Sequence, residues 1–397
     1  MTRLGYKSTE VGEIPENWGI KRIRQVAEVK YGKSNPNTEG NIPLIGSSGV
    51  FGTVRVPLID KPTLVIGRKG TAGSVWDIRT PSWPSDTSFY LDYMTELVQK
   101  FLFEYMSFKR LSGENAKTTL PSLKREDVED YQFPLPPLPE QQKIAEILTT
   151  ADRKIELINK EIQATEKLKK GLMQTLLTRG IGHTKLKMTE IGEIPEKWES
   201  KKLGDIMNLR EKKTDLVTTG IAVIPMELVP QHSMYCDYKI IDESTVRPPT
   251  YCEPGDLLIP KITPSVENGK QGIVPDLPHD FGFATSEVFA IACSKGVLNY
   301  FLFYLLKMDS LRGVLINSMI GSTGRQRVPK ETLVNLKVPV PPFSEQRRIA
   351  EILSTVDKKL EWLHYKKGKS ELLKKGLMQV LLTGHVRVNT CPAQGDN

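Results

Sequence analysis

Two long stretches of the chain place apolar residues at steps that alternate between three and four. The first covers residues 140–179, has no proline and contains one glycine, Gly171. Its seam positions are Ile144, Leu148, Ala151, Ile155, Ile158, Ile162, the weaker Thr165, Leu168, Leu172 and Leu176. This spacing is typical of the heptad seam of a coiled coil. We therefore predict a first spacer helix over residues 140–179, roughly 57 Å long.

The second stretch, residues 345–384, repeats the pattern with one interruption. Its seam positions are Ile349, Leu353, Val356, Leu360, Leu363, Leu373, Leu377 and Leu381. The seam falters at Lys367-Gly368-Lys369, and the sequence leaves its continuity there open. Two seams of matched length favour mutual pairing over two amphipathic helices that each pack on their own domain. The predicted pairing residues are Ile144, Leu148, Ile155 and Ile162 with Ile349, Leu353, Val356 and Leu360.

The helices belong to an internal duplication. "LKKGLMQTLLT" at 168–178 returns as "LKKGLMQVLLT" at 373–383, and "PLPPLPEQQKIAEIL" at 134–148 returns as "PVPPFSEQRRIAEIL" at 339–353, both 205 positions later. "TEVGEIPENW" at 9–18 returns as "TEIGEIPEKW" at 189–198, only 180 positions later. We call this second repeat the GEIP motif. Each half is thus a GEIP motif, a variable block and a helix, and the second variable block is 25 residues longer.

Connectivity predicts the arrangement of these parts. The first helix ends where the second block begins, and the second helix starts from that block, so the two helices should run antiparallel. The second GEIP motif follows the first helix directly, so the first copy should lie beyond the second helix, near Gly384 and His385. We divide the chain into residues 1–139 (first variable domain with its GEIP motif), 140–179 (first helix), 180–344 (second variable domain), 345–384 (second helix) and 385–397 (tail).

The variable blocks mix strand and helix patterns. "NIPLIGSSG" (41–49), "PTLVIGRKGTAGSVW" (62–76), "GDLLIPKI" (255–262) and "SEVFAIAC" (286–293) are β-rich runs cut by glycine and proline. "TELVQKFLFEYMSF" (95–108) and "NYFLFYLLKM" (299–308) are predicted helices. The expected fold class is α+β, with two mixed domains joined by two long antiparallel helices as a pseudo-twofold repeat.

A formal net charge of +8 favours a polyanionic partner without deciding it. Loops rich in Arg, Lys, Thr, Gln and Gly supply donors to phosphates and base edges. The DNA-binding candidates are Arg68, Lys69, Thr71, Lys109, Arg110 and Lys117 in the first block, and Lys261, Lys270, Arg325, Gln326 and Arg327 in the second. "KTTLP" (117–121) and "RQRVP" (325–329) share a small pattern. For "GRKGTAG" (67–73), the motif alone favours a tight turn with a solvated charge pair over a phosphate contact.

The sequence lacks the motifs of several other classes of protein. Four cysteines without a CxxC pair argue against a disulfide framework or zinc site, and five histidines show no metal-ligand spacing. No apolar run approaches the roughly 20 residues of a membrane span, and the N-terminus lacks a signal-peptide core, so we expect a soluble, intracellular protein. "RPPTY" (247–251) is the nearest text to an amine-methyltransferase loop and fails at both ends. Neither a Gly-rich nucleotide loop nor a GxxxxGK[ST] motif is present.

"PLPPLPEQQKIAEIL", "LKKGLMQTLLTRGIGHTKLK" and "TEIGEIPEKW" resemble the repeated regions of specificity subunits of type I restriction-modification systems. The resemblance implies two target recognition domains that each read one half of a split, asymmetric double-stranded DNA sequence. It also implies paired helices that act as a spacer and dock two modification subunits. Those partners would bind S-adenosylmethionine and methylate adenine, and restriction subunits would supply ATP-driven, Mg-dependent translocation and cleavage. This chain would be cytoplasmic, without a membrane partner, and would bind no cofactor itself.

Two other classes stay open at this point. One is an enzyme, a single-chain methyltransferase or nuclease with a diverged motif. The other is a scaffold that holds protein partners and binds no DNA. A chain with one decayed recognition domain is a variant of the main hypothesis. The recognised bases themselves do not follow from the sequence, because base contacts depend on where a few side chains sit in a groove.

Overall fold

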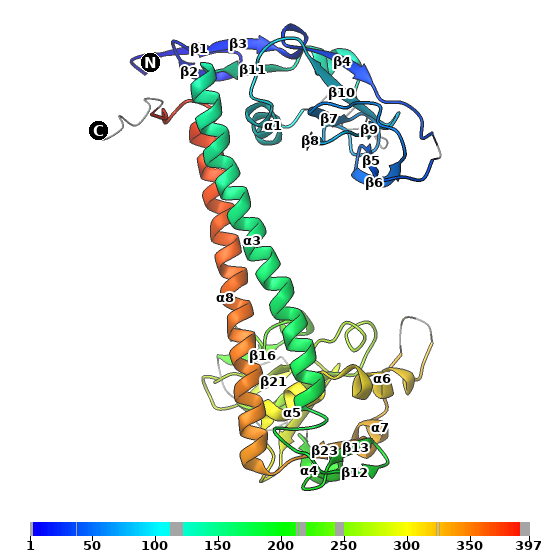
Figure 1. Cartoon of the computed structure of the whole chain (residues 1–397). Coiled ribbons are helices and arrows are strands. Elements are labelled where there is room, and N and C mark those ends of the chain that lie inside the picture. Colours follow the sequence, from blue (N-terminus) through cyan, green and yellow to red (C-terminus); the bar gives the residue numbers. More distant parts are fainter. Residues whose placement is uncertain are drawn as a thin grey trace, which may run out of the picture. The chain divides into compact units, whose positions relative to one another are not determined.

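The computed structural model describes residues 3–36, 38–111, 122–211, 213, 220–242, 250–322, 324 and 326–389. The chain forms two compact units. Unit 1 combines Met1–Asn159 with Tyr365–Asn397, and unit 2 is Lys160–His364. Each unit therefore holds one variable domain and one end of each long helix (Figure 1). In the described part of the chain, no helix is long and apolar enough to cross a membrane.

The two predicted long helices are present as α3 (Leu138–Leu176) and α8 (Phe343–Leu381). In unit 1, Ile144 and Leu148 near the start of α3 share a core with Leu381 at the end of α8. In unit 2, the end of α3 shares a core with Ile349 and Leu353 near the start of α8. The helices therefore pack antiparallel in both units, as connectivity predicted. Helix α8 also continues without a break through Lys367-Gly368-Lys369.

The seam differs from the predicted heptad in places. Of the predicted pairing residues, Ile144, Leu148, Ile162, Ile349 and Leu353 are buried, whereas Ile155, Val356 and Leu360 are half-buried. Leu168 and its repeat counterpart Leu373 were placed on the seam, but they are 55% and 56% exposed. The later seam positions Leu176 and Leu381 are buried again, so the departure from the heptad is local.

One small polar residue is buried in the later half of each long helix. These are Thr165 and Ser370, which stand 205 positions apart in the repeat. Each hydroxyl donates to a carbonyl one turn earlier: Thr165 to Glu161 at 2.7 Å and Ser370 to Lys366 at 2.9 Å. Their buried donors are therefore satisfied inside the helix.

Unit 1 is built around an antiparallel sheet in the order β4-β10-β7-β8. Its helices besides the long pair are η1 (Ile23–Gln25), α1 (Gln99–Phe108) and α2 (Arg125–Glu129). Its strands are β1 (Tyr6–Thr9), β2 (Gly12–Pro15), β3 (Gly19–Arg22), β4 (Ala27–Tyr31), β5 (Ile42–Gly46), β6 (Gly49–Val54), β7 (Thr63–Gly67), β8 (Val75–Ile78), β9 (Trp83–Pro84), β10 (Ser88–Tyr93) and β11 (Gln132–Leu135). A smaller sheet, β6-β5-β9, stands beside the main one, and β1-β2 and β3-β11 form separate pairs.

Unit 2 repeats this plan with a larger second sheet. Its main sheet is β15-β22-β19-β20 and its second sheet is β17-β16-β21-β18. Its strands are β12 (Leu186–Thr189), β13 (Gly192–Pro195), β14 (Glu199–Lys202), β15 (Met207–Leu209), β16 (Ile221–Ile224), β17 (Lys239–Ile241), β18 (Thr250–Cys252), β19 (Leu257–Pro260), β20 (Gly272–Ile273), β21 (Gly282–Ala284), β22 (Val288–Cys293) and β23 (Lys337–Val340). Its further helices are α4 (Leu203–Ile206), η2 (Met226–Leu228), α5 (Asn299–Leu305), α6 (Asp309–Asn317) and α7 (Lys330–Asn335). These mixed domains confirm the α+β class.

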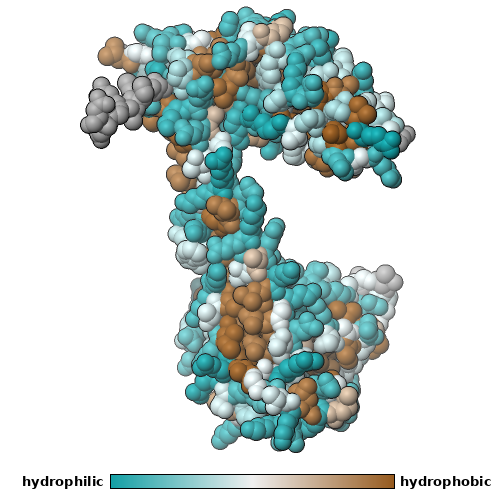
Figure 2. All heavy atoms as spheres, viewed as in Figure 1, coloured by the Kyte–Doolittle hydropathy of each residue, from teal (hydrophilic) through white to brown (hydrophobic). Residues whose placement is uncertain are grey.

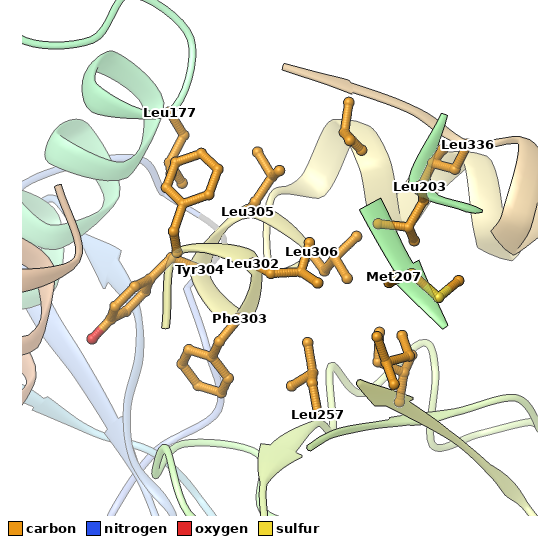
Figure 3. Close-up of a cluster of buried hydrophobic side chains, with 14 of the residues drawn as sticks. Leu177, Leu203, Met207, Leu257, Leu302, Phe303, Tyr304, Leu305, Leu306 and Leu336 are labelled. Atoms are coloured by element: carbon orange, nitrogen blue, oxygen red, sulfur yellow. The ribbon is translucent and has the colours of Figure 1, made fainter. Parts of the chain in front are cut away.

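Helix α5 explains why "NYFLFYLL" is apolar on all sides. Its residues from Phe301 to Leu305 are all buried. Figure 3 shows them between Leu177 of the α3 end and residues such as Leu257 on the main sheet. The helix packs on both neighbours at once and has no face left for solvent.

The first GEIP motif lies where the duplication placed it, next to the residues that follow α8. The Tyr6 hydroxyl donates to the carbonyl of Gly384 at 2.8 Å, and Arg3 donates to the carbonyl of His385 at 3.1 Å. Gly384 has φ +68° and sits against the rings of Pro15 and Trp18, where a side chain would collide. The predicted closure of the chain on itself is therefore confirmed within unit 1.

Candidate nucleic-acid interface

Arg68 and Lys261 hold equivalent positions in the two units. Each follows the last residue of the central strand, β7 or β19. The carbonyl of Arg68 accepts from the amide of Leu123 at 2.9 Å, and that of Lys261 accepts from the amide of Val328 at 2.8 Å. The same backbone frame therefore presents one cation at the same edge of each main sheet.

Each of these cations also lies over an aromatic ring of the neighbouring strand. The guanidinium of Arg68 is 5.9 Å from the ring centre of Phe89 and 5.1 Å from that of Tyr31. The ammonium of Lys261 is 5.1 Å from the ring centre of Phe289, the counterpart of Phe89. Cation–π contacts of this kind orient a charged group without neutralising it. The side chains of Arg68 and Lys261 are thus held in defined positions over the rings of the neighbouring strands.

The loop "GRKGTAG" is a tight turn that closes the β7–β8 hairpin. The amide of Gly67 donates to Ser74 at 2.8 Å and that of Gly73 donates to Gly67 at 2.9 Å. Lys69 and Thr71 are exposed on this turn, and Lys69 forms a backbone bridge with Ser122. The backbone therefore forms the predicted tight turn. The side chains of Lys69 and Thr71 are exposed on it.

Lys109 and Arg110 follow α1 and are exposed. The carbonyl of the next residue, Leu111, stands where a side chain on Gly73 would be. The fold therefore brings the Lys109–Arg110 segment beside the β7–β8 turn that carries Lys69. Five of the six candidates in the first block lie together, and the sixth, Lys117, lies outside the described residues.

In unit 2 the structure joins Lys261, Gln326 and Arg327. The amide of Thr263 donates to the carbonyl of Gln326 at 3.1 Å, and Arg327 pairs with Ile320 through two backbone hydrogen bonds of 2.8 and 3.0 Å. The Arg327 side chain is exposed, and Gln326 is half-buried. Arg325 lies outside the described residues.

Lys270 has a different setting from the other candidates. Its half-buried ammonium donates to the carbonyl of Met226 at 2.8 Å, so it ties its loop to η2. The residues of "KTTLP" (117–121) lie outside the described part of the chain, so the match with "RQRVP" stays a prediction. The bridge of Ile262 with Arg327 takes the place of that between Lys69 and Ser122.

A pair of glutamines that sequence reasoning did not single out docks each variable domain on the long helices. Gln141 of α3 accepts from the amide of Val98, just before α1, at 3.1 Å. Its repeat counterpart Gln346 of α8 accepts from the amide of Leu298, just before α5, at 2.8 Å. Both glutamines are buried. The signal was present in the sequence, because each follows the repeated glutamate of "PEQ" and "SEQ".

Charged contacts complete the docking in unit 1. The fully buried carboxylate of Glu104 lies 2.7 Å from the ammonium of Lys100 and 3.1 Å from that of Lys374 on α8. Asp152 of α3 lies 3.0 Å from Lys100 and 2.6 Å from Lys374. Burial opposes the ionisation of Asp152, but hydrogen bonds from Lys374 and Lys100 hold its pKa below the usual value.

Unit 2 uses a tyrosine in the place of Glu104. The hydroxyl of Tyr304 donates to Asp357 at 2.7 Å, and Lys169 pairs with the same carboxylate at 2.5 Å. Burial and the adjacent Asp357 raise the pKa of Tyr304, so this hydroxyl keeps its proton. Each variable domain is thus held on its helices by a glutamine and an aspartate from the repeat. Among the described residues, no group of three or more His, Cys, Asp or Glu side chains is arranged so that it could hold a metal ion.

Comparison with known proteins identifies the class. The model of the type I restriction modification DNA specificity domain matches residues 15–167 and again 195–371, once in each half. Because these matches cover most of the chain, it belongs to the family of type I restriction-modification specificity subunits. The type I restriction enzyme MjaVIII specificity subunit of Methanocaldococcus jannaschii is 28% identical over 94% of both chains. The EcoAI specificity subunit of Escherichia coli is 30% identical, over 40% of this chain and 27% of that protein.

Solved structures show the same fold. The S subunit of a type I restriction-modification system from M. genitalium superposes with a TM-score of 0.62 at 18% identity, over 92% of this chain and 96% of that one. A chain from a study of complex assembly and conformational transition of the type I R-M system superposes with a TM-score of 0.55 at 14% identity, over 94% and 99%.

Proposed function

We propose that this chain is the subunit that reads the DNA target of a type I restriction-modification complex, and that each variable domain reads one half of a bipartite, asymmetric sequence. The observation that carries this proposal is the equivalence of Arg68 and Lys261. Two domains with the same frame present a cation at the same edge, while the neighbouring side chains differ. Two domains that share this backbone arrangement but carry different side chains around the cation suit two half-sites of different sequence.

The paired helices would set the distance between half-sites and dock two modification subunits. Support for docking comes from apolar side chains that the helices leave in solvent: Leu157, Leu168, Trp362, Tyr365, Leu372 and Leu373. Figure 2 shows hydrophobic side chains over the helix pair of unit 2. In unit 1, a groove between the two helices is lined by Ile147, Ala151, Leu373 and Leu377 among others. Exposed apolar stripes of this kind are typical of surfaces that receive another helix.

The chain itself would be non-catalytic and cytoplasmic. Modification subunits would bring S-adenosylmethionine and the methyl transfer, and restriction subunits would bring ATP and Mg. The role left to this chain is to hold partners and to choose the sequence. Such a division fits a protein whose repeated residues, such as Gln141 and Gln346, serve to dock domains on helices.

Methylation mapping of DNA from cells that carry the complete system tests the proposal. The map should contain a split motif with two dissimilar halves. Lys69→Ala should then weaken or relax one half only, and Arg327→Ala the other half only. Loss of a phosphate contact should lower the slope of log affinity against log salt concentration by about one. Loss of a base contact should relax the specificity at one base pair of the target. Lys187→Ala, which removes an exposed lysine on β12, serves as the control. A single substitution that relaxes both halves would contradict the separation of the domains.

A further inference from the structure

The β5–β6 hairpin of unit 1 carries two consecutive apolar side chains in solvent at its tip. Val50 is 63% exposed and Phe51 is 58% exposed. Single exposed apolar residues are ordinary, but an adjacent pair on a hairpin marks a contact surface. Figure 2 shows hydrophobic side chains gathered at this end of the unit, over β5 and β6.

This tip is held firmly against the β7–β8 hairpin. The Ser74 hydroxyl donates to the carbonyl of Ser47 in the turn, and the Trp76 indole donates to the same carbonyl at 3.4 Å. Gly49 has φ +104° and lies against the Trp76 ring, which stands 3.1 Å from where a side-chain carbon would be. A turn tied in this way presents Val50 and Phe51 in a defined direction.

The apolar tip and the basic turn share one residue, Thr87. The Phe51 ring lies 3.0 Å, and the Thr87 hydroxyl 3.1 Å, from where a side-chain carbon at Gly46 would be. The carbonyl of Thr87 accepts from the amides of Arg68 at 2.8 Å and Lys69 at 3.2 Å. The exposed phenyl ring therefore lies near the residue that fixes the backbone of the half-buried Arg68 and the exposed Lys69.

This combination fits duplex DNA better than an apolar protein groove. Cations suit the phosphates, and apolar side chains suit the methyl group of thymine, the one apolar group on a base edge in the major groove. The major groove also admits a two-stranded β-ribbon. On the proposed function, Arg68 and Lys69 already belong to the DNA-facing edge.

We propose that the β5–β6 hairpin enters the major groove at the first half-site, and that Phe51 and Val50 contact a thymine methyl group there. This inference rests on the proposed function and concerns the first half-site alone. In unit 2, β16 pairs with β21 in parallel, as β5 does with β9, but β16 is followed by the long connection 225–238 and not by a tight turn. The two domains thus differ at the place where, on this proposal, bases are read.

Binding by the complex of this chain with its modification subunit provides the test. Duplexes would carry the mapped target with the thymines of the first half-site replaced by uracil, one at a time. For the unaltered chain, one replacement should weaken binding about fourfold, the effect of one buried methyl group. Phe51→Ala should weaken binding to the target at least about fivefold, leave binding to unrelated DNA and the salt slope unchanged, and show no further loss on that uracil duplex.

Two variants keep the result interpretable. Met94→Ala removes an apolar side chain that is 60% exposed at the far end of β10 from Thr87, and it should behave as the unaltered chain. Phe51→Leu keeps an apolar tip and should retain part of the uracil sensitivity. The inference is overturned if Phe51→Ala keeps full uracil sensitivity, or if it weakens all DNA equally. A complex that prefers no sequence at all would instead overturn the proposed function.

Discussion

The guanidinium of Arg387 donates two hydrogen bonds to the carboxylate of Glu140, of 2.7 Å to Oε1 and 2.9 Å to Oε2. The carboxylate is only 3% exposed, and it also accepts from the Trp18 indole at 2.9 Å. One residue of α3 therefore ties together the GEIP motif and the segment that follows α8. The repeat counterpart Glu345 accepts from Trp198 at 3.0 Å and contacts His183 at 2.8 Å.

Removing Arg387 should destabilise unit 1. Arg387→Ala leaves a buried carboxylate with Trp18 as its remaining donor, so we expect a loss of about 1–3 kcal/mol in the free energy of unfolding. The loss is small for a buried ion pair because water reaches the arginine side chain, which is 43% exposed. Urea unfolding measures the change. The double variant Glu140→Gln/Arg387→Ala should recover part of the loss, and Arg153→Ala, at an exposed arginine of α3, should have little effect. If Arg387→Ala and Arg153→Ala had equal free energies of unfolding, the Arg387–Glu140 pair would not stabilise unit 1.

A circularly permuted chain should fold and support methylation. The Tyr6 hydroxyl reaches the carbonyl of Gly384, so a flexible linker between the original termini replaces a connection that the fold already holds together. Opening the chain after the exposed Thr184 leaves His183, which contacts Glu345, attached to the end of α3. The measurement is methylation of the mapped target in cells. Opening within α3 at Glu161 is the matched control and should abolish activity. Failure of the Thr184 permutant, with a long enough linker, would count against the closure.

Lengthening α3 should change the spacing between half-sites and leave the recognised bases unchanged. Four residues inserted near Glu161 add roughly 6 Å and about one turn, so the apolar seam nearly keeps its face. One base pair rises about 3.4 Å, and we expect a gap larger by one pair, because α8 resists the change. Binding should weaken, since each pair also rotates the second half-site by roughly 35°. Methylome sequencing decides: unchanged spacing with altered half-site bases would show that the helices are not the ruler.

The stability of unit 2 should rise in mildly alkaline solution because of Lys307. Its ammonium donates to the carbonyl of Gln231 at 3.0 Å beside the Phe303 ring, and burial lowers its pKa from 10.5 to about 8. Between these values the unfolded chain binds more protons than the folded chain, so the free energy of unfolding rises with pH. Lys307→Met should be more stable than the unaltered chain near pH 7, and this advantage should shrink by pH 10. Urea unfolding at both values tests it, and an advantage independent of pH would contradict the shifted titration.

The long helices, the duplication and the chain closure were all predictable because they depend on local periodicity and on order along the chain. Apolar spacing identified α3 and α8, and the repeated order along the chain placed the first GEIP motif near Gly384, where Pro15 and Trp18 lie. The seam was wrong at one place in each helix. Leu168 and Leu373 fit a strict heptad but are exposed, whereas the weaker seam position Thr165 and the residue Ser370, which was not predicted, are buried.

The sequence by itself determined a twofold protein built from repeated helices and divergent blocks, because those properties are written in local patterns. Only the tertiary structure decided which basic residues share an edge and that Arg68 corresponds to Lys261. Strand register comes from long-range pairing, and the blocks between repeats have diverged too far for alignment to supply it. The place of Phe51 near Thr87, whose carbonyl accepts from the Lys69 amide, follows likewise from long-range packing. These contacts join residues that are close in space but distant in the chain, and no local pattern encodes them.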